Sequence, residues 1–359
     1  MIMMKPALFA IPFALALATV PFTAAGANAA PLPGLGADLE HTSVSGLSSG
    51  GFMAAQIATA YSSAIKGVAV IAGGPFDCAS TYPEQSPLQN AVTACMQPVS
   101  AATTADAAVS WRNAQRYAQE GLIDPVANLA RQRVYVFSGT EDRTVRTSVV
   151  DQVEKYYRLA GVAPAAIVYS KNVAAGHAIL TDRPEDGPCA ATQAPYINNC
   201  GFTQSHDLLR QLAGPGSQPP NLGQSTGHLI RFDQGEFLRG SRNSMDDVGY
   251  AYVPLDCLNN ACAVHVVFHG CQQGATRIGA RFYAGTGYNQ YADTNRLIVL
   301  YPQVRASNGI LVNPQGCWDF WGYSGDNASR PDFQTRQAPQ MAAVMAMVRR
   351  LGQARATPR

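Results

Sequence analysis

The sequence predicts an α/β fold in which a mostly parallel central sheet is covered by helices on both faces. Short, continuous apolar runs recur along the chain, and such runs are typical of parallel strands buried on both faces. Segments of helical composition alternate with these runs, which is the pattern of a parallel sheet with crossover helices. Hydrophobic residues make up 47% of the 359 residues and charged residues only 14%, so a large core is available.

The expected elements fall into two groups separated by residues 212–226, which are rich in Gly, Pro, Ser and Gln and are typical of a linker. In the first group we expect strands at 41–47, 68–72, 133–138 and 166–170 and helices at 52–62, 106–120 and 149–159. In the second group we expect two segments of antiparallel character at 228–238 and 249–255, strands at 263–268 and 297–301, and helices at 287–295 and 337–352.

The first 29 residues have the pattern of a signal peptide. Lys5 precedes an apolar run from Pro6 to Val20, and Ala27–Ala29 forms an Ala-x-Ala cleavage site. A membrane anchor is the alternative, but Pro12 and Pro21 interrupt a run that is short for a span of about 20 residues. We therefore expect an extracellular or periplasmic protein without stable membrane insertion.

Eight cysteines lie in the exported part, and an even number in an oxidising compartment indicates disulfides. Connectivity is not determined by sequence, and neighbour pairing is the simplest expectation. It joins Cys78 to Cys95, Cys189 to Cys200, Cys257 to Cys262, and Cys271 to Cys317. Zinc binding is the competing interpretation, but no Cys-x-x-Cys pair occurs, so we expect no metal.

The strongest local signal is Gly46-Leu47-Ser48-Ser49-Gly50, which matches the G-x-S-x-G nucleophile elbow. The motif follows an expected strand and precedes an expected helix, as an elbow requires, whereas a Gly-rich strand–helix loop is the plain alternative. Ser48 is therefore the candidate nucleophile, and the backbone N–H of Ser49 is a candidate oxyanion donor.

A serine nucleophile needs a base, and the base needs an orienting carboxylate. Asp142 follows the strand at 133–138, and we prefer it to Glu141, although either acid is also explained as a helix cap or loop charge. His177 follows the next strand beside Gly176 and is the candidate base. The less suitable histidines are His41, His206, His228 and His265, the last of which lies inside an apolar strand.

The second oxyanion donor is expected after another strand. His269-Gly270-Cys271 follows the strand at 263–268 and resembles the His-Gly start of an esterase oxyanion loop, so the N–H of Cys271 is the candidate. Alternatively, His269 and Cys271 only pin a turn. Trp318 and Trp321 lie in an aromatic cluster beside this loop, and we expect Trp318 to form an apolar wall for substrate, although aromatic residues more often belong to a core.

The order of these blocks predicts a circular permutation. In ordinary esterases the oxyanion strand precedes the nucleophile, whereas here it follows the nucleophile by more than two hundred residues. The C-terminal helix is then the element expected to lead into the elbow strand, and residues 212–226 join the old ends. Chain termini of compact domains are often close together, so we expect residues 30–359 to form one catalytic domain.

Six segments together resemble the single-domain extracellular polyhydroxybutyrate (PHB) depolymerases with a circularly permuted α/β-hydrolase fold. The segments are SVSGLSSGGFMAAQ, AGGPFDCA, FSGTEDRTV, AGHAILTD, VVFHGCQQ and NPQGCWDFWGY. The resemblance implies a secreted enzyme that hydrolyses poly(3-hydroxybutyrate) to oligomers and monomer without a cofactor. It assigns Ser48, Asp142 and His177 to the triad, Ser49 and Cys271 to the oxyanion hole, and Trp318 to the cleft.

Two other functions stay open at this stage. A secreted carboxylesterase for small or plant cell-wall esters shares every catalytic residue, and a non-catalytic polyester-binding protein with a decayed site is the alternative from another class. The net charge of +2 provides no basic stripe, so nucleic acid is not an expected partner. We expect a monomer whose partner is the polyester substrate.

Overall fold

The computed structural model describes residues 29–240, 242–309, 311–325 and 331–355. The predicted signal peptide, apart from Ala29, lies outside these residues. No helix in the described ranges has the length and apolar character needed to cross a membrane.

An eight-stranded sheet forms the centre of the molecule, with the strand order β4-β3-β2-β1-β10-β11-β9-β8. The first six strands in this order, β4-β3-β2-β1-β10-β11, pair in parallel. Strand β9 pairs antiparallel with both β11 and β8. The predicted mostly parallel sheet is confirmed, as is the antiparallel character of the two segments after residue 226. The strands are β1 (Asp38–Leu47), β2 (Ile65–Ile71), β3 (Arg133–Phe137), β4 (Ile167–Ser170), β8 (His228–Asp233), β9 (Val248–Val253), β10 (Ala263–Phe268) and β11 (Leu297–Tyr301).

Helices cover both faces of this sheet because successive side chains of a strand point to opposite sides. In β2, Val68 and Val70 belong to one buried cluster, while Ala69 and Ile71 belong to the other. The first cluster includes residues of α1 (Ser49–Ala60), α3 (Ala107–Gln119), α4 (Thr147–Leu159) and α9 (Pro339–Leu351). The second includes residues of α5 (Gln204–Ala213), α7 (Arg281–Gly285) and α8 (Tyr288–Asn295).

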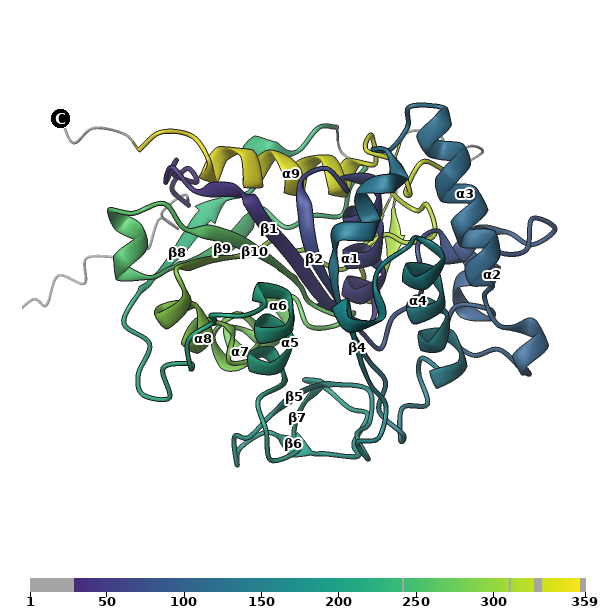
Figure 1. Ribbon diagram of the computed structural model, residues 1–359, viewed down its shortest axis with the longest axis horizontal. Helices are drawn as coiled ribbons and strands as arrows, with labels where there is room; N and C mark the ends of the chain where they lie inside the picture. Colours follow the sequence, from purple (N-terminus) through teal and green to yellow (C-terminus); the bar gives the residue numbers. More distant parts are fainter. Residues whose placement is uncertain (1–28, 241, 310, 326–330, 356–359) are drawn as a thin grey trace, which may run out of the picture.

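The two ends of the described chain meet beside the elbow strand. The carbonyl of Leu351, the last residue of α9, accepts hydrogen bonds from the N–H groups of Leu35 (2.9 Å) and Ala37 (3.0 Å), just before β1 begins. Figure 1 shows α9, in yellow, beside the start of β1, in purple. Strand β10 pairs directly with β1 although most of the chain separates them. These contacts are the ones that the predicted circular permutation requires.

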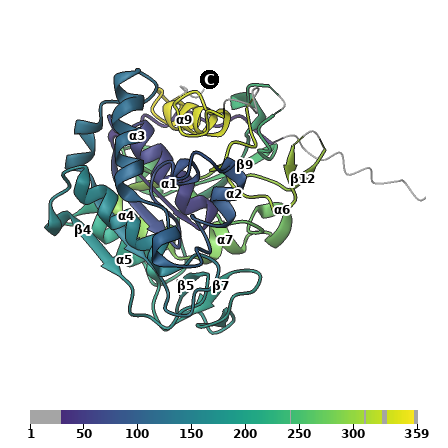
Figure 2. The same ribbon diagram turned by 90° about the vertical axis from the view of Figure 1, so that its right-hand side faces the viewer.

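Several short elements were not expected from the sequence. A small three-stranded sheet of β5 (Ile179–Thr181), β7 (Ile197–Asn199) and β6 (Gly187–Pro188) follows the His177 loop and lies at the bottom of the molecule in Figure 2. Helix α5 occupies the segment before the expected linker, and α2 (Pro87–Val92) lies between two expected elements. Strands of two or three residues are too short to show a hydrophobic period, so their sequences contain no usable signal.

All four neighbour disulfides are present. Cys78 is joined to Cys95, Cys189 to Cys200, Cys257 to Cys262, and Cys271 to Cys317, and no described cysteine is free. The Cys271–Cys317 bridge links the loop after β10 to the aromatic segment that begins at Trp318. It therefore restrains two long-range neighbours, whereas the other three bridges close short local loops.

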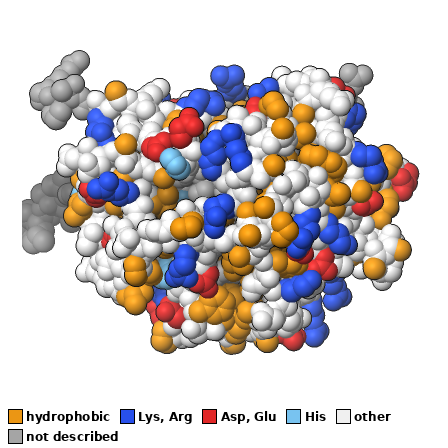
Figure 3. Space-filling view, in the orientation of Figure 1, with side chains coloured by type: hydrophobic (Ala, Val, Ile, Leu, Met, Phe, Trp, Pro, Cys, Tyr) orange, Lys and Arg blue, Asp and Glu red, His pale blue; other side chains and the backbone are white. Residues whose placement is uncertain are grey.

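The surface carries charges of both signs. On the face drawn in Figure 3, Lys and Arg side chains are interspersed with Asp, Glu and uncharged side chains instead of forming one continuous stripe. This distribution agrees with the small net charge of +2.

Candidate active site

Ser48 lies on a strained turn between β1 and α1. Its backbone has φ 57° and ψ −124°, a conformation that non-glycine residues rarely adopt. A Cβ on Gly46 would lie 2.1 Å from the carbonyl oxygen of Gly50, and one on Gly50 would lie 2.3 Å from the carbonyl oxygen of Phe268. Both glycines are therefore required by close backbone contacts, which explains the spacing of the motif.

His177 and Asp142 form a buried hydrogen-bonded pair. The His177 Nδ1 lies 2.8 Å from the Asp142 Oδ2, and each residue is only 5% exposed. The other oxygen of Asp142 accepts the backbone N–H groups of Thr144 (2.8 Å) and Val145 (3.0 Å), which hold the carboxylate in place. Because a carboxylate only accepts, the Nδ1 carries the proton, and the neutral ring has a free lone pair on Nε2. Glu141, the rival acid, is exposed.

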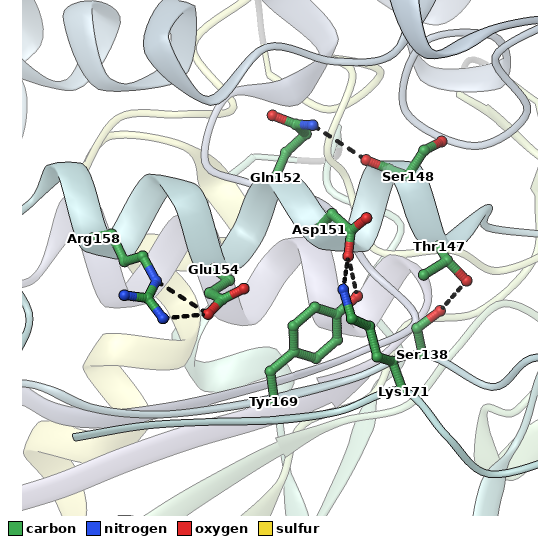
Figure 4. A network of polar contacts seen from close by, with 9 residues as sticks. All are labelled: Ser138, Thr147, Ser148, Asp151, Gln152, Glu154, Arg158, Tyr169 and Lys171. Carbon is green, nitrogen blue, oxygen red and sulfur yellow. Dashed lines mark hydrogen bonds and ion pairs between the residues drawn. The ribbon is translucent and has the colours of Figure 1, made fainter. Parts of the chain in front are cut away.

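Hydrogen bonds and a close backbone contact hold the loops that carry this pair. The hydroxyl of Ser138, just after β3, lies 2.8 Å from the hydroxyl of Thr147 at the start of α4, and this hydrogen bond closes the Asp142 loop (Figure 4). The backbone N–H of His177 donates to the hydroxyl of Thr192 (3.0 Å). A Cβ on Gly139 would lie 2.1 Å from the carbonyl oxygen of Ala175, so the two loops touch at their backbones.

Helix α4 in turn is held against the edge strand β4. Asp151 of α4 accepts hydrogen bonds from the Tyr169 hydroxyl (2.9 Å) and the Lys171 ammonium (2.8 Å), both on or beside β4 (Figure 4). Helix α4, which follows the Asp142 loop, is therefore held against the edge of the sheet.

Ser48 and His177 line one pocket with a volume of about 320 Å³. Ser49, Gly270 and Cys271 line the same pocket. Four of the five predicted catalytic and oxyanion positions therefore lie in one pocket, and the fifth, Asp142, lies behind His177. No hydrogen bond joins the Ser48 hydroxyl to the His177 ring among the described contacts.

The walls of the pocket are apolar and uncharged. No Asp, Glu, Lys or Arg lines it among the described residues. Its apolar lining includes side chains from α1, from α2 and the residues just after it, and from the segment after Cys317, namely Phe52, Leu88, Ala91, Val92, Met96, Phe320 and Trp321.

The two predicted donors occupy suitable backbone positions. Ser49 is the first residue of α1, and the first N–H groups of a helix have no acceptor inside it. Cys271 follows β10, and its N–H has no acceptor among the described residues, while its side chain is held by the bridge to Cys317.

The placement of Trp318 corrects a sequence prediction. Its side chain is fully buried, it does not line the pocket, and it packs against Phe268 and His269 at ring distances of 5.0 and 5.7 Å. Phe320 and Trp321 form the aromatic wall instead.

Asp319 orders this wall, because its carboxylate accepts the backbone N–H groups of residues 321–324. Burial raises the pKa of the Asp319 carboxyl.

Two of the other histidines, His265 and His206, have structural surroundings. His265 is fully buried and bonded to the hydroxyls of Ser43 (2.7 Å) and Ser45 (2.8 Å), as expected for a histidine inside an apolar strand. Burial lowers the pKa of His265 to about 3. His206 is bonded to the carbonyl of Gly287 at 3.1 Å.

The pocket is also lined by three glutamines, Gln272, Gln273 and Gln315. No sequence pattern indicated them, because glutamine carries no motif signal.

Comparison with known proteins gives consistent results. The chain is 41% identical over 324 residues to a poly(3-hydroxybutyrate) depolymerase of Delftia acidovorans, covering 89% of this chain and 61% of that protein. It is 36% identical over 343 residues to a polyhydroxybutyrate depolymerase of Talaromyces funiculosus, covering 91% of this chain and 94% of that protein. The chain thus spans less than two thirds of the length of the Delftia relative.

Solved structures agree with these relatives. A PHB depolymerase from Penicillium funiculosum superimposes with a TM-score of 0.77 at 32% identity, covering 90% of this chain and 98% of that chain. A serine-to-alanine variant of a PHB depolymerase in complex with an R3HB trimer gives a TM-score of 0.76 with the same identity and coverage. A scan against models of protein families matches none of them. The identity of 36% across nearly the whole of the Talaromyces relative shows that this chain belongs to the polyhydroxybutyrate depolymerase family.

Proposed function

We propose that this protein is a secreted serine esterase that hydrolyses poly(3-hydroxybutyrate) through an acyl-enzyme, with Ser48 as nucleophile. The observation that carries the proposal is the strained Ser48 elbow in one apolar pocket with His177, whose Nδ1 is bonded to Asp142 at 2.8 Å. A serine nucleophile, a buried base and an orienting carboxylate are the parts that acyl transfer needs.

In this mechanism the Nε2 of His177 takes the proton of the Ser48 hydroxyl as the serine oxygen attacks the ester carbonyl. The N–H groups of Ser49 and Cys271 stabilise the oxyanion of the tetrahedral intermediate. His177 then gives the proton to the leaving alcohol. Water repeats the sequence on the acyl-enzyme, releasing the acid and restoring Ser48.

The character of the pocket supports a neutral, aliphatic substrate. An uncharged lining offers no partner to a charged substrate, while its apolar side chains suit the methyl and methylene groups of a hydroxybutyrate ester. The relatives are named as depolymerases of this polymer, and one related structure holds an R3HB trimer.

The same proposal includes the setting of the enzyme. Four disulfides support export to an oxidising compartment, extracellular or periplasmic, after removal of residues 1–29. Residues 30–359 would act as a single catalytic domain and as a monomer. A mature N-terminus at Ala30 by mass spectrometry and one mass of about 35 kDa in solution, scaled from the 38.1 kDa full chain, are the expected results.

The experiment compares the wild-type protein with Ser48→Ala on films of poly(3-hydroxybutyrate) and on p-nitrophenyl butyrate. We expect the wild type to clear the film and hydrolyse the aryl ester, and the variant to lose on the order of 10⁶ in kcat on both. Equal polymer release by the two proteins would refute the proposal. Activity on the aryl ester alone would move the assignment to a small-ester carboxylesterase.

A further inference from the structure

Gly270 lies between two peptide planes, and both planes are anchored by buried side chains. The N–H of Gly270 donates to the Gln273 Oε1 (2.7 Å), and its carbonyl lies 2.7 Å from the His269 Nδ1. The backbone N–H of Gln273 also donates to that carbonyl (3.2 Å). Because glycine has no side chain to limit φ and ψ, these contacts determine the conformation of the loop.

The plane that follows Gly270 contains the N–H of Cys271. A trans peptide is planar and its C=O and N–H point in opposite directions, so fixing the Gly270 carbonyl fixes the direction of the Cys271 N–H. Cys271 lines the pocket beside Ser48. The hydrogen bond from His269 therefore acts on the direction of an oxyanion donor without touching the substrate.

The proton position on His269 follows from its partners. The Gly270 carbonyl only accepts, so Nδ1 carries the proton, and the N–H of Val304 only donates, so Nε2 is the acceptor at 3.3 Å. Burial lowers the pKa of His269 to about 4, which keeps the ring neutral. His269 is fully buried and does not line the pocket, so this ring has a supporting role only.

Gln273 extends the support to the loop that holds the base. Its Nε2 donates to the carbonyls of Pro195 (2.9 Å) and Tyr196 (3.0 Å). The Tyr196 carbonyl also accepts the N–H of Ile179 (3.0 Å), two residues after His177, and the Tyr196 ring lies edge-on to the His177 ring at 6.4 Å. Gln273 is 1% exposed, and its amide uses both N–H groups and its oxygen in these contacts.

We propose that His269 and Gln273 are positioning residues that aim the Cys271 N–H at the oxyanion and hold this donor in register with His177. The inference rests on the proposed function. Preorganised donors stabilise a transition state because they need no reorganisation when charge develops. Misdirecting the donor should therefore lower kcat, while the apolar walls that bind the ground state keep KM unchanged.

The first test uses two amide variants of His269. His269→Asn keeps a donor at the Nδ1 position, whereas His269→Gln places its amide at the Nε2 position and loses that donor. We expect His269→Gln to have a kcat on p-nitrophenyl butyrate about tenfold below that of His269→Asn, a fraction of the 10²–10³ that removing a whole donor costs, with KM values within about twofold. Equal kcat values for the two folded variants would overturn the role of His269.

The second test has a matched control. Gln273→Glu keeps the acceptor for Gly270 but loses both donors, and we expect kcat to fall about tenfold with KM nearly unchanged. Gln132 is equally buried and its Nε2 donates to the carbonyls of Ala58 (2.8 Å) and Ile65 (3.1 Å), at the N-terminal ends of β2 and β3 and outside the pocket lining. Gln132→Glu should lower the melting temperature. Its kcat per folded molecule, with the folded fraction measured by circular dichroism, should stay at the wild-type value.

The outcomes separate this inference from the proposed function. Wild-type protein without esterase activity, or with activity that survives Ser48→Ala, refutes the function itself. An active wild type whose Gln273→Glu variant is folded and keeps full kcat refutes the positioning role alone. If Gln273→Glu does not fold, the His269 pair decides.

Discussion

At the scale of single residues, the site depends on groups whose surroundings leave them one arrangement. Asp142 has both oxygens engaged, one by His177 and one by two backbone N–H groups, so it cannot turn away from the imidazole. Ser48 has a positive φ that its glycine neighbours make possible. Residue types and spacing single out both residues as candidates, because each proposed role needs a particular side chain at a particular point of the elbow or loop.

The role of Asp142 can be tested without disturbing the fold. Asp142→Asn keeps the shape and the two backbone contacts but presents an amide to Nδ1, which favours the wrong tautomer of His177. We expect kcat on p-nitrophenyl butyrate to fall on the order of 10⁴ while the melting temperature changes little. A variant that retains a tenth or more of wild-type kcat would show that Asp142 does not orient the base.

At the scale of elements, buried polar groups join segments that the sequence leaves unconnected. Asp77 is fully buried beside the Cys78–Cys95 bridge and contacts two residues of α3, Asn113 (2.8 Å) and Tyr117 (3.2 Å), as well as the Ser80 hydroxyl (2.6 Å). It links α3 to the segment that carries α2, and α2 forms one wall of the pocket. Burial raises the pKa of Asp77 to about 6.

This shift predicts a pH dependence of stability. Since the folded pKa lies above the 3.8 of an unperturbed aspartate, the folded state binds the proton more tightly, and stability falls as pH rises from about 4 to about 6. Asp77→Asn removes this dependence, which amounts to roughly 3 kcal/mol at most. Urea unfolding of both proteins at pH 4 and pH 7 measures the difference; parallel changes in the two proteins would contradict the assignment.

At the scale of the whole molecule, the permuted order has a direct physical consequence. The last turn of α9 and the segment before β1 are already hydrogen-bonded, with the N–H of Gly36 2.8 Å from the carbonyl of Gln353. A covalent link between these two segments would therefore need only a short linker. Opening the chain between residues 214 and 227 would cut a segment that lies outside the main sheet.

A re-permuted protein should therefore fold and work. In a variant that begins near residue 220, with residue 355 connected to residue 30 by a short Gly-Ser linker, we expect kcat on p-nitrophenyl butyrate within about threefold of wild type, because no catalytic contact crosses the new ends. Loss of folding would show that the 214–227 segment does more than connect the two halves.

The sequence by itself determined the order of the main strands and helices, the elbow motif, the candidate acid and base and the permuted order of the blocks, whereas for the disulfides it offered neighbour pairing only as the simplest expectation. Most of these features have a local cause, such as a buried apolar run or a glycine required by a turn. Only the tertiary structure decided that Trp318 is buried while Phe320 and Trp321 face the pocket, and that Gln273 bridges the oxyanion loop to Pro195. Those arrangements depend on packing between segments far apart in the chain, and no local pattern encodes which side of a loop faces a cavity.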